Sequence, residues 1–294
     1  MKPPPFEYDA PASVEEALAL LAEHGADAKV LAGGQSLVPL LNFRLARPAR
    51  LVDLNNLGEL SGVRRTGGEL HIGAMTRQSM LERSETVASH WPLLRQAIDY
   101  VAHAQIRNRG TVGGSMAHAD PAAELPVALA ALDGWVVVRS LRGERVIRWN
   151  ELFVTHLTTS LEPDELLVEV RIPALPERTG ASFTEYARRH GDFALGGAAV
   201  TVTADAAGVC ERAAIALLAA APTPLRAAEA ERVLTGRRID ADAAREAAAE
   251  AVRDLKPTGD IHGSSAYRQR LIESMVRRAV IAAAEHASTE KVAA

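Results

Sequence analysis

The stretch LAGGQSLVPLLNFRLARP, residues 31–48, and the stretch RNRGTVGGSMAHADPAAELP, residues 107–126, each place two adjacent glycines and a serine between a strand-like and a helix-like segment. Without a Cβ atom, a glycine backbone can approach a ligand closely, and adjacent N–H groups can point at one anion. A helix that follows adds the positive end of its dipole. Two such turns favour one shared, elongated, phosphate-bearing ligand, although spacing alone leaves simple chain reversal open.

Neither turn has the G-x-G-x-x-G pattern of an ordinary dinucleotide-binding fold or the signature of a P-loop nucleotide hydrolase. The 294 residues are 48% hydrophobic and 4% aromatic, and the formal net charge is −4. This composition is ordinary for a globular protein and offers no footprint for nucleic acid. Prolines near the N-terminus occupy the place of a signal-peptide core, and no apolar run could span a membrane, so we expect a cytoplasmic protein.

The cysteine and histidine content limits the chemistry of the chain. Cys210 is the single cysteine, so an internal disulfide is excluded and the chain cannot hold an iron–sulfur cluster by itself. The histidines include His103, His118 and His190, but no H-x-x-x-H or H-E-x-x-H spacing occurs. We therefore expect no metal site in this chain.

Hydrophobic periodicity and turn residues predict an α+β fold. Its three units are expected to span residues 1–55, 56–176 and 177–294. The first reads as a small strand–helix–strand unit, with Ser13 and Glu16 as the capping box of its helix. The second reads as a larger mixed unit containing two hairpins and a helix capped by Ser89. The third reads as a three-stranded antiparallel sheet with helices.

Longer stretches around the two turns carry a specific resemblance. Two stretches resemble the two FAD-binding motifs of the medium subunits of molybdenum hydroxylases. They are VLAGGQSLVPLLNFRLARPARLVDLN, residues 30–55, and RNRGTVGGSMAHADPAAELPVALAAL, residues 107–132. These are the flavoprotein subunits of the aerobic carbon monoxide dehydrogenase type, which are related to the FAD domain of xanthine dehydrogenase. YARRHGDFALGGAAV, residues 186–200, resembles the start of that family's C-terminal domain. The likeness runs through essentially the whole chain in the same order.

The resemblance implies that the two turns hold the FAD diphosphate from opposite sides, the first with backbone amides and a serine hydroxyl. The first-turn residues assigned in this way are Ala32, Gly33, Gly34, Gln35, Ser36 and Leu37. Those of the second turn are Thr111, Val112, Gly113, Gly114 and Ser115. Arg107 and Arg109 precede the second turn, and the sequence leaves open whether they offset the diphosphate charge, pair with a partner chain or lie on the surface.

Five further residues are expected near the cofactor on the same basis. The resemblance implies that Glu124 accepts hydrogen bonds from the ribityl chain or ribose, although a carboxylate in the first turn of a helix needs no ligand. Leu167 would contact the isoalloxazine, or simply belong to the core of its strand. Asp192 and Phe193 are expected in the flavin region, Phe193 where many relatives carry a tyrosine. His118 lies beside the second turn and could contact the ring or the diphosphate.

The resemblance also implies an electron-transfer function. In such complexes a large subunit oxidises the substrate at a molybdopterin centre, two [2Fe–2S] clusters of a small subunit pass the electrons on, and FAD in the medium subunit delivers them to an external acceptor. We therefore expect both partner subunits, in a dimer of heterotrimers. A flavin-free scaffold of the same complex and a self-contained flavin oxidase are the alternatives. The intact glycine turns argue against the scaffold, and the small third unit argues against the oxidase.

Overall fold

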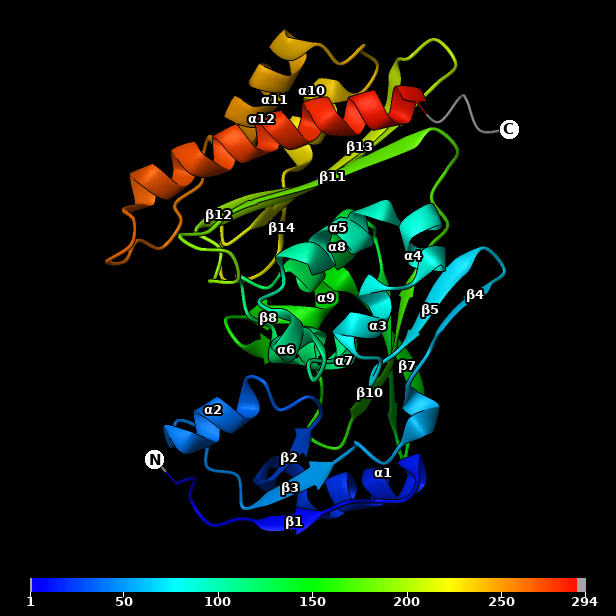
Figure 1. Ribbon diagram of the computed structural model, residues 1–294, viewed down its shortest axis with the longest axis vertical. Coiled ribbons are helices and arrows are strands. Elements are labelled where there is room, and N and C mark those ends of the chain that lie inside the picture. Colours follow the sequence, from blue (N-terminus) through cyan, green and yellow to red (C-terminus); the bar gives the residue numbers. More distant parts are fainter. Residues whose placement is uncertain (1, 290–294) are drawn as a thin grey trace.

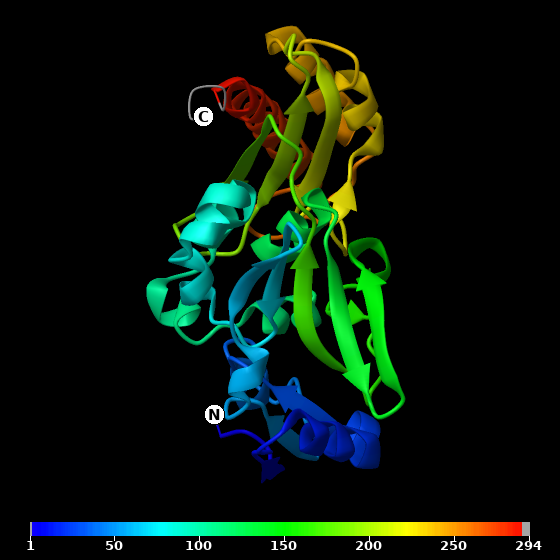
Figure 2. The same ribbon diagram turned by 90° about the vertical axis from the view of Figure 1, so that its right-hand side faces the viewer.

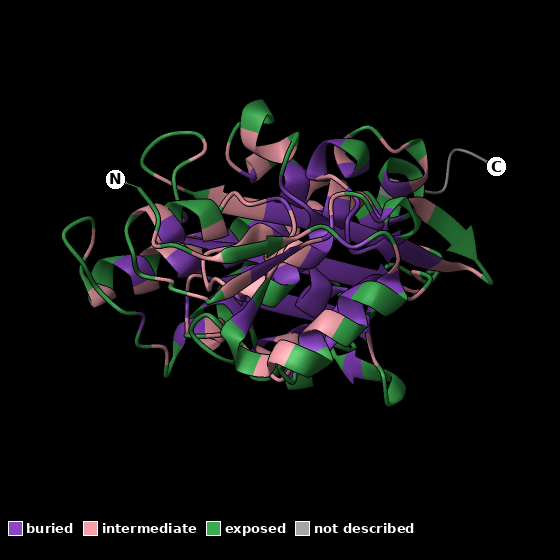
Figure 3. Ribbon diagram, turned by 90° about the horizontal axis from the view of Figure 1, so that it is seen from below, coloured by how far each residue is buried: buried purple, intermediate pink, exposed green. Residues whose placement is uncertain are grey.

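The computed structural model describes residues 2–289 of the chain. Three units follow one another along the longest axis of the molecule, with the N-terminal unit at one end and the C-terminal unit at the other (Figure 1 and Figure 2). Buried residues fill the interior, and exposed residues form the outer surface (Figure 3). No helix within the described range combines the length and the apolar character that crossing a bilayer requires.

The first unit is a three-stranded parallel sheet, in the order β1-β3-β2, with two helices. Its elements are β1 (Glu7–Asp9), α1 (Val14–His24), β2 (Ala28–Leu31), α2 (Leu37–Asn42) and β3 (Arg50–Asp53). The Ser13 hydroxyl caps α1 by accepting from the Glu16 N–H at 3.1 Å, and the Glu16 carboxylate accepts from the Ala12 N–H at 2.8 Å. The predicted strand–helix–strand unit is present, and β1 widens its sheet.

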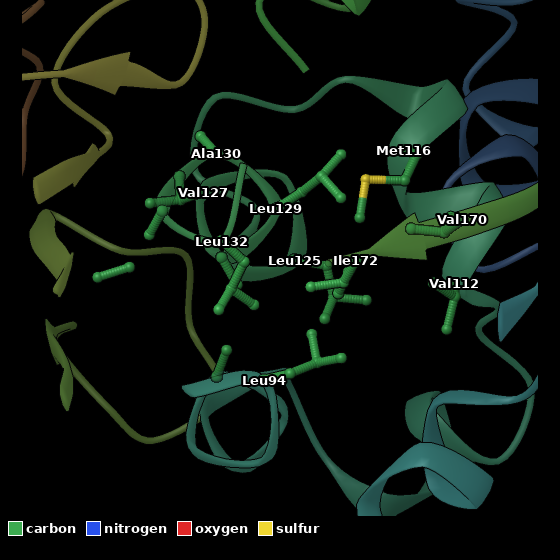
Figure 4. Close-up of a cluster of buried hydrophobic side chains, with 14 of the residues drawn as sticks. Leu94, Val112, Met116, Leu125, Val127, Leu129, Ala130, Leu132, Val170 and Ile172 are labelled. Atoms are coloured by element: carbon green, nitrogen blue, oxygen red, sulfur yellow. The ribbon is translucent and has the colours of Figure 1, made fainter. Parts of the chain in front are cut away.

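The second unit has a five-stranded antiparallel sheet in the order β4-β5-β10-β6-β7. Its strands are β4 (Val63–Thr66), β5 (Glu69–Gly73), β6 (Trp135–Ser140), β7 (Gly143–Arg148) and β10 (Leu166–Ile172), with the small pair β8 (Phe153–Thr155) and β9 (Thr158–Thr159). Its helices are α3 (Gln78–Glu82), α4 (Glu85–His90), α5 (Pro92–Tyr100), α6 (Ala104–Arg107), α7 (Val112–His118), α8 (Glu124–Ala131) and α9 (Trp149–Leu152). Buried side chains of α5, α7, α8 and β10 form one core (Figure 4).

The cap predicted for the helix after residue 88 is wrong. Ser89 lies inside α4, and Ser84 caps that helix by accepting from the Val87 N–H at 3.3 Å. The next helix, α5, begins at Pro92, which has no N–H and a fixed φ suited to the first helical position. A serine is therefore not needed at that point.

The third unit is an antiparallel sheet in the order β11-β12-β13-β14, covered by helices. Its elements are β11 (Thr179–Tyr186), β12 (Gly196–Ala204), β13 (Cys210–Leu218), β14 (Leu225–Arg226), α10 (Ala228–Leu234), α11 (Ala241–Val252) and α12 (Ser265–Thr289). The first three strands are the predicted ones, and the two-residue β14 extends the sheet. A Cβ atom at Gly180 would overlap the Ala283 carbonyl, so this glycine lets α12 lie directly on the sheet (Figure 1).

The opposite face of this sheet packs on α5 and α8 of the second unit. The Phe183 ring lies 5.5 Å from the Tyr100 ring, centroid to centroid, and the Phe183 N–H donates to Gln96 Oε1 at 2.8 Å. Buried residues of both units belong to the same hydrophobic cluster. The loop between β11 and β12, residues 187–195, is thereby held beside the second unit.

Candidate cofactor site

A cavity of about 770 Å³ lies between the first and second units and reaches the β11–β12 loop. Such a volume is typical of sites for cofactors and other small molecules. Every predicted cofactor residue except Val112 lines it. These residues are Ala32, Gly33, Gly34, Gln35, Ser36, Leu37, Thr111, Gly113, Gly114, Ser115, His118, Glu124, Leu167, Asp192 and Phe193.

The first turn, residues 32–36, connects β2 to α2 and carries a row of unpaired donors beside the cavity. Within residues 2–289, the backbone N–H groups of residues 33–37 have no hydrogen-bond acceptor, and the Ser36 hydroxyl has no partner. Gly34 has a φ of +74°, a conformation that favours glycine. Adjacent unpaired N–H groups in a concave turn need water or an anion as acceptor. The first turn therefore fits a diphosphate.

Gly33 packs the first turn directly against the segment that precedes the second turn. A Cβ atom at Gly33 would overlap the Arg109 carbonyl oxygen and lie 2.8 Å from Gly110 Cα. Backbone therefore meets backbone where the two units join. This contact fixes the separation of the two turns.

The second turn, residues 111–115, does not lie between a strand and a helix as the sequence predicted: it follows α6 and forms the N-cap and first turn of α7. Four of its N–H groups donate within the protein: Val112 to Thr76 O at 3.0 Å, Gly113 to Ala74 O at 2.8 Å, Gly114 to Thr111 Oγ1 at 3.1 Å, and Ser115 to Thr111 O at 3.1 Å. A Cβ atom at Gly113 would lie 2.5 Å from Ala74 Cβ, so this glycine serves close packing. The Ser115 hydroxyl lines the cavity and has no partner among the described residues. It remains an available donor.

Val112 does not face the cavity, contrary to the sequence expectation. Its side chain is 1% exposed and belongs to the core of the second unit, where Figure 4 shows it near Val170. Val112 is the first residue of α7, and the apolar side chain anchors this helix while its glycine neighbours turn toward the cavity. Its contribution to the site is indirect.

Glu124 and His118 place titratable groups in the cavity wall. Glu124 is the first residue of α8, and burial, with a smaller contribution from Asp120, raises the pKa of its carboxyl to about 7. Burial also lowers the pKa of His118, so the neutral imidazole predominates at neutral pH. No ion pair engages Glu124 within the described range. Its carboxylate is free to accept hydrogen bonds from a ligand hydroxyl.

Leu167, Asp192 and Phe193 line the cavity from two other elements. Leu167 is 5% exposed and lies on β10 beside a register shift, so it is both strand core and cavity wall. Asp192 and Phe193 belong to the β11–β12 loop, and Phe193 is 75% exposed. The exposed ring forms an apolar border at the mouth of the cavity. This side of the cavity can take a planar ring.

The structure shows the surroundings of the two arginines whose roles the sequence left open, and it adds a residue to the cavity wall. Arg107 donates to both carboxylate oxygens of Glu82, at 3.0 and 2.9 Å, and is a structural residue. Arg109 is exposed and has no ion pair within residues 2–289. Gln78, at the start of α3, lines the cavity and is 6% exposed. A polar residue at a helix start gives no sequence signal for such a role.

A search of the described residues for metal ligands finds no group of three or more His, Cys, Asp or Glu side chains that could hold a metal ion. Cys210 is buried, and burial raises the pKa of its thiol to about 11. The thiol is thus protonated and unreactive at neutral pH.

The cavity has the features of a site for an FAD-like dinucleotide. These are the free amides of the first turn, the close-packed second turn, the Glu124 carboxyl group and the apolar border. The model of the FAD binding domain in molybdopterin dehydrogenase matches residues 4–175, and the model of the CO dehydrogenase flavoprotein C-terminal domain matches residues 181–283. The chain belongs to this family, the FAD-binding medium subunits of molybdenum hydroxylases.

Similar proteins share the whole length of the chain. The 6-hydroxypseudooxynicotine dehydrogenase complex subunit alpha of Paenarthrobacter nicotinovorans is 50% identical over 99% of this chain and 98% of its own. The caffeine dehydrogenase subunit beta of Pseudomonas sp. (strain CBB1) is 42% identical, with 97% of each chain covered. A solved structure of carbon monoxide dehydrogenase from Hydrogenophaga pseudoflava superimposes with a TM-score of 0.94 at 40% identity, covering 97% of this chain and 99% of the other.

Proposed function

We propose that the chain takes electrons from [2Fe–2S] clusters of a small partner subunit and passes them to an external acceptor. A large molybdopterin-binding subunit would oxidise the substrate, in a cytoplasmic dimer of heterotrimers. The observation that carries the proposal is the row of unpaired N–H groups at residues 33–37 beside a cavity of cofactor size. This arrangement provides hydrogen-bond donors without protein acceptors where a diphosphate would lie.

Bound FAD supplies chemistry that the side chains lack, because it can take up electrons singly and release them in pairs. The residues of the chain position it. The first turn holds the diphosphate, the Ser115 hydroxyl donates from the facing wall, and the Glu124 carboxylate accepts from ribityl or ribose hydroxyls. Leu167 and Phe193 border the ring. We keep residues 1–55 and 56–176 as the two parts of the FAD-binding domain and 177–294 as the C-terminal domain.

The partner subunits follow from what the chain lacks and from its relatives. A single buried cysteine cannot ligate a cluster, so the clusters would lie on another chain. The relatives are named for a nicotine derivative, caffeine and carbon monoxide. Because these substrates differ so much while the flavoprotein chain stays similar, we assign substrate choice to the large subunit.

A second hollow supports passage of electrons to an external acceptor. It measures about 850 Å³ and shares Gly191, Asp192 and Phe193 with the cofactor cavity. An acceptor in this hollow would be separated from the ring site only by the β11–β12 loop. The exposed Phe193 ring lies at that border.

The experiment that tests the proposal is an absorption spectrum of the complex purified with its partner subunits, followed by mass identification of the cofactor released on denaturation. Releasable FAD that is reduced when the complex is given substrate supports the relay. An assembled complex without flavin refutes it and favours the scaffold. FAD that turns over a substrate in the isolated chain also refutes it and favours the oxidase.

A further inference from the structure

Gln78 is an unpaired polar side chain packed where the two turns meet. It is 6% exposed, it lines the cavity, and its buried Oε1 has no hydrogen-bond partner within the described residues. A Cβ atom at Gly110 would lie 2.5 Å from this oxygen, so the glycine leaves room for the amide. Gly110 in turn contacts Gly33 of the first turn. A buried amide without a protein partner is costly unless a ligand supplies one.

The preceding residue, Arg77, joins the two turns from the other side. Its Nη2 donates to Asn55 Oδ1 at 2.6 Å, and Asn55 Nδ2 donates to the Ala32 carbonyl at 3.0 Å. Its Nη1 donates to the Arg109 carbonyl. One guanidinium group therefore connects the first turn, through Asn55, to the segment before the second turn. A planar, multidentate donor suits such a bridge.

The charge of this bridge is not paired directly with a carboxylate within residues 2–289, although Asp53 lies near it. Arg77 is half-buried, and neither Arg77 nor Arg109 forms an ion pair within residues 2–289. Burial, and then the positive charge of Arg109, lower the pKa of Arg77, and the negative charge of Asp53 opposes this shift only in part. In contrast, the nearby Arg107 is neutralised by Glu82 at 2.9 Å. Two neighbouring cations without carboxylate partners suit an anionic ligand beside the first turn.

We propose that Arg77 and Gln78 form a third part of the cofactor site, in which the Gln78 amide contacts the cofactor where the turns meet, its Nε2 donating to a diphosphate oxygen and its Oε1 accepting from a ribose hydroxyl. Arg77 is a positioning residue that sets the separation of the turns through Asn55 and the Arg109 carbonyl. The inference rests on the proposed function, because FAD is the ligand that it concerns. It assigns binding to a helix start that lies outside both glycine motifs.

The test measures the dissociation constant of FAD, by flavin fluorescence, in the assembled complex after mild removal of flavin. The variants are Gln78→Met and Arg77→Met, with Gln96→Met and Arg95→Met as matched controls. Gln96 is bonded to the Phe183 N–H and Arg95 to Asp99, and none of these four residues lines the cavity. We expect Kd to rise on the order of tenfold for each site variant and to stay unchanged in the controls.

A second measurement separates binding from folding. The melting temperature is recorded with and without saturating FAD, because a ligand that binds the native state adds a stability increment set by its Kd. The site variants should reduce this increment, whereas the controls should lower both melting temperatures together. If Gln78→Met does not fold, Gln78→Glu is expected to bind FAD still more weakly, because it places a carboxylate beside the diphosphate.

The outcomes are distinguishable from failure of the proposed function. A wild-type complex that binds no FAD overturns the proposed function itself. A wild-type complex that binds FAD, with an unchanged Kd and increment in Gln78→Met, overturns the direct contact. An unchanged Kd in Arg77→Met overturns the positioning role.

Discussion

Glu185, on β11, carries a carboxyl group whose ionisation the fold opposes. One of its oxygens is buried without a hydrogen-bond partner among the described residues. Burial, and then the negative charge of Glu124, raise the pKa of this carboxyl to about 9. In the unfolded chain the pKa of a glutamate is about 4.3. Between these two values the folded chain holds the extra proton, so its stability is greatest at low pH and falls as pH rises toward 9.

The perturbation is Glu185→Gln, which keeps the shape of the side chain and removes the titration. A proton held by the folded state alone is worth about 1.4 kcal/mol per pH unit. From pH 6 to pH 8, wild type should therefore lose about 2–3 kcal/mol of unfolding free energy that the variant does not lose. Glu124, whose pKa is raised to about 7, adds a loss that both proteins share.

The assay is urea unfolding of the full chain at pH 6, 7 and 8, for wild type and Glu185→Gln. Glu144→Gln is the control, because Glu144 is exposed on β7 and forms no ion pair within residues 2–289. We expect the stability difference between Glu185→Gln and wild type to grow with pH in favour of the variant, and the control to follow wild type. Parallel pH profiles for all three proteins would refute the reasoning.

Three further predictions concern cofactor binding, each measured as the Kd of FAD in the assembled complex. Gly33→Ala should weaken binding at least about tenfold, because the new Cβ atom pushes the turns apart. The control Gly58→Ala, with open space around the new Cβ atom, should leave the Kd unchanged, and equal Kd values for the two variants would count against the close-approach argument. In wild type, binding should strengthen as pH rises through about 7 and the acceptor Glu124 ionises, and Glu124→Gln should abolish this dependence; a persisting one would assign it elsewhere. Gly114→Val, whose Cβ would lie 2.6 Å from Thr111 Oγ1, should lose FAD and keep the fold; full flavin occupancy would contradict the assignment of this turn.

The elements that local residues dictate could be predicted from the sequence. Ser13 and Glu16 identify the start of α1 because a helix cap depends on residues within one turn. The first glycine turn could be placed between a strand and a helix for the same reason, whereas the second glycine pair lies in the first turn of α7 and follows helix α6, not a strand. The cap at Ser89 failed because Ser84 offers the same chemistry five residues earlier, and local rules do not choose between two caps that compete.

The remaining features depend on contacts between distant segments. Val112 belongs to a motif whose neighbours line the cavity, yet its side chain enters the core because α7 packs on β10. Gln78 lies more than thirty residues from either glycine turn along the chain. It is buried because Gly110 packs against its side chain in the folded protein. The high pKa of Glu185 likewise follows from the packing of the third unit on α8. Hydrophobic periodicity in the sequence predicts none of these contacts between distant segments.

Similar glycine pairs therefore serve different physical purposes in the two turns. In the first turn, Gly34 takes a positive φ and the amides around it stay unpaired, so we expect the backbone itself to bind the diphosphate. In the second turn, Gly113 permits close approach to Ala74, and the amides of residues 112–115 donate to Ala74, Thr76 and Thr111. The first glycine of each pair, Gly33 or Gly113, permits close approach to protein backbone, and only the first turn leaves its amides free for a ligand. We therefore expect cofactor affinity to depend on the packing of Gly110 against Gly33, and not on either motif alone.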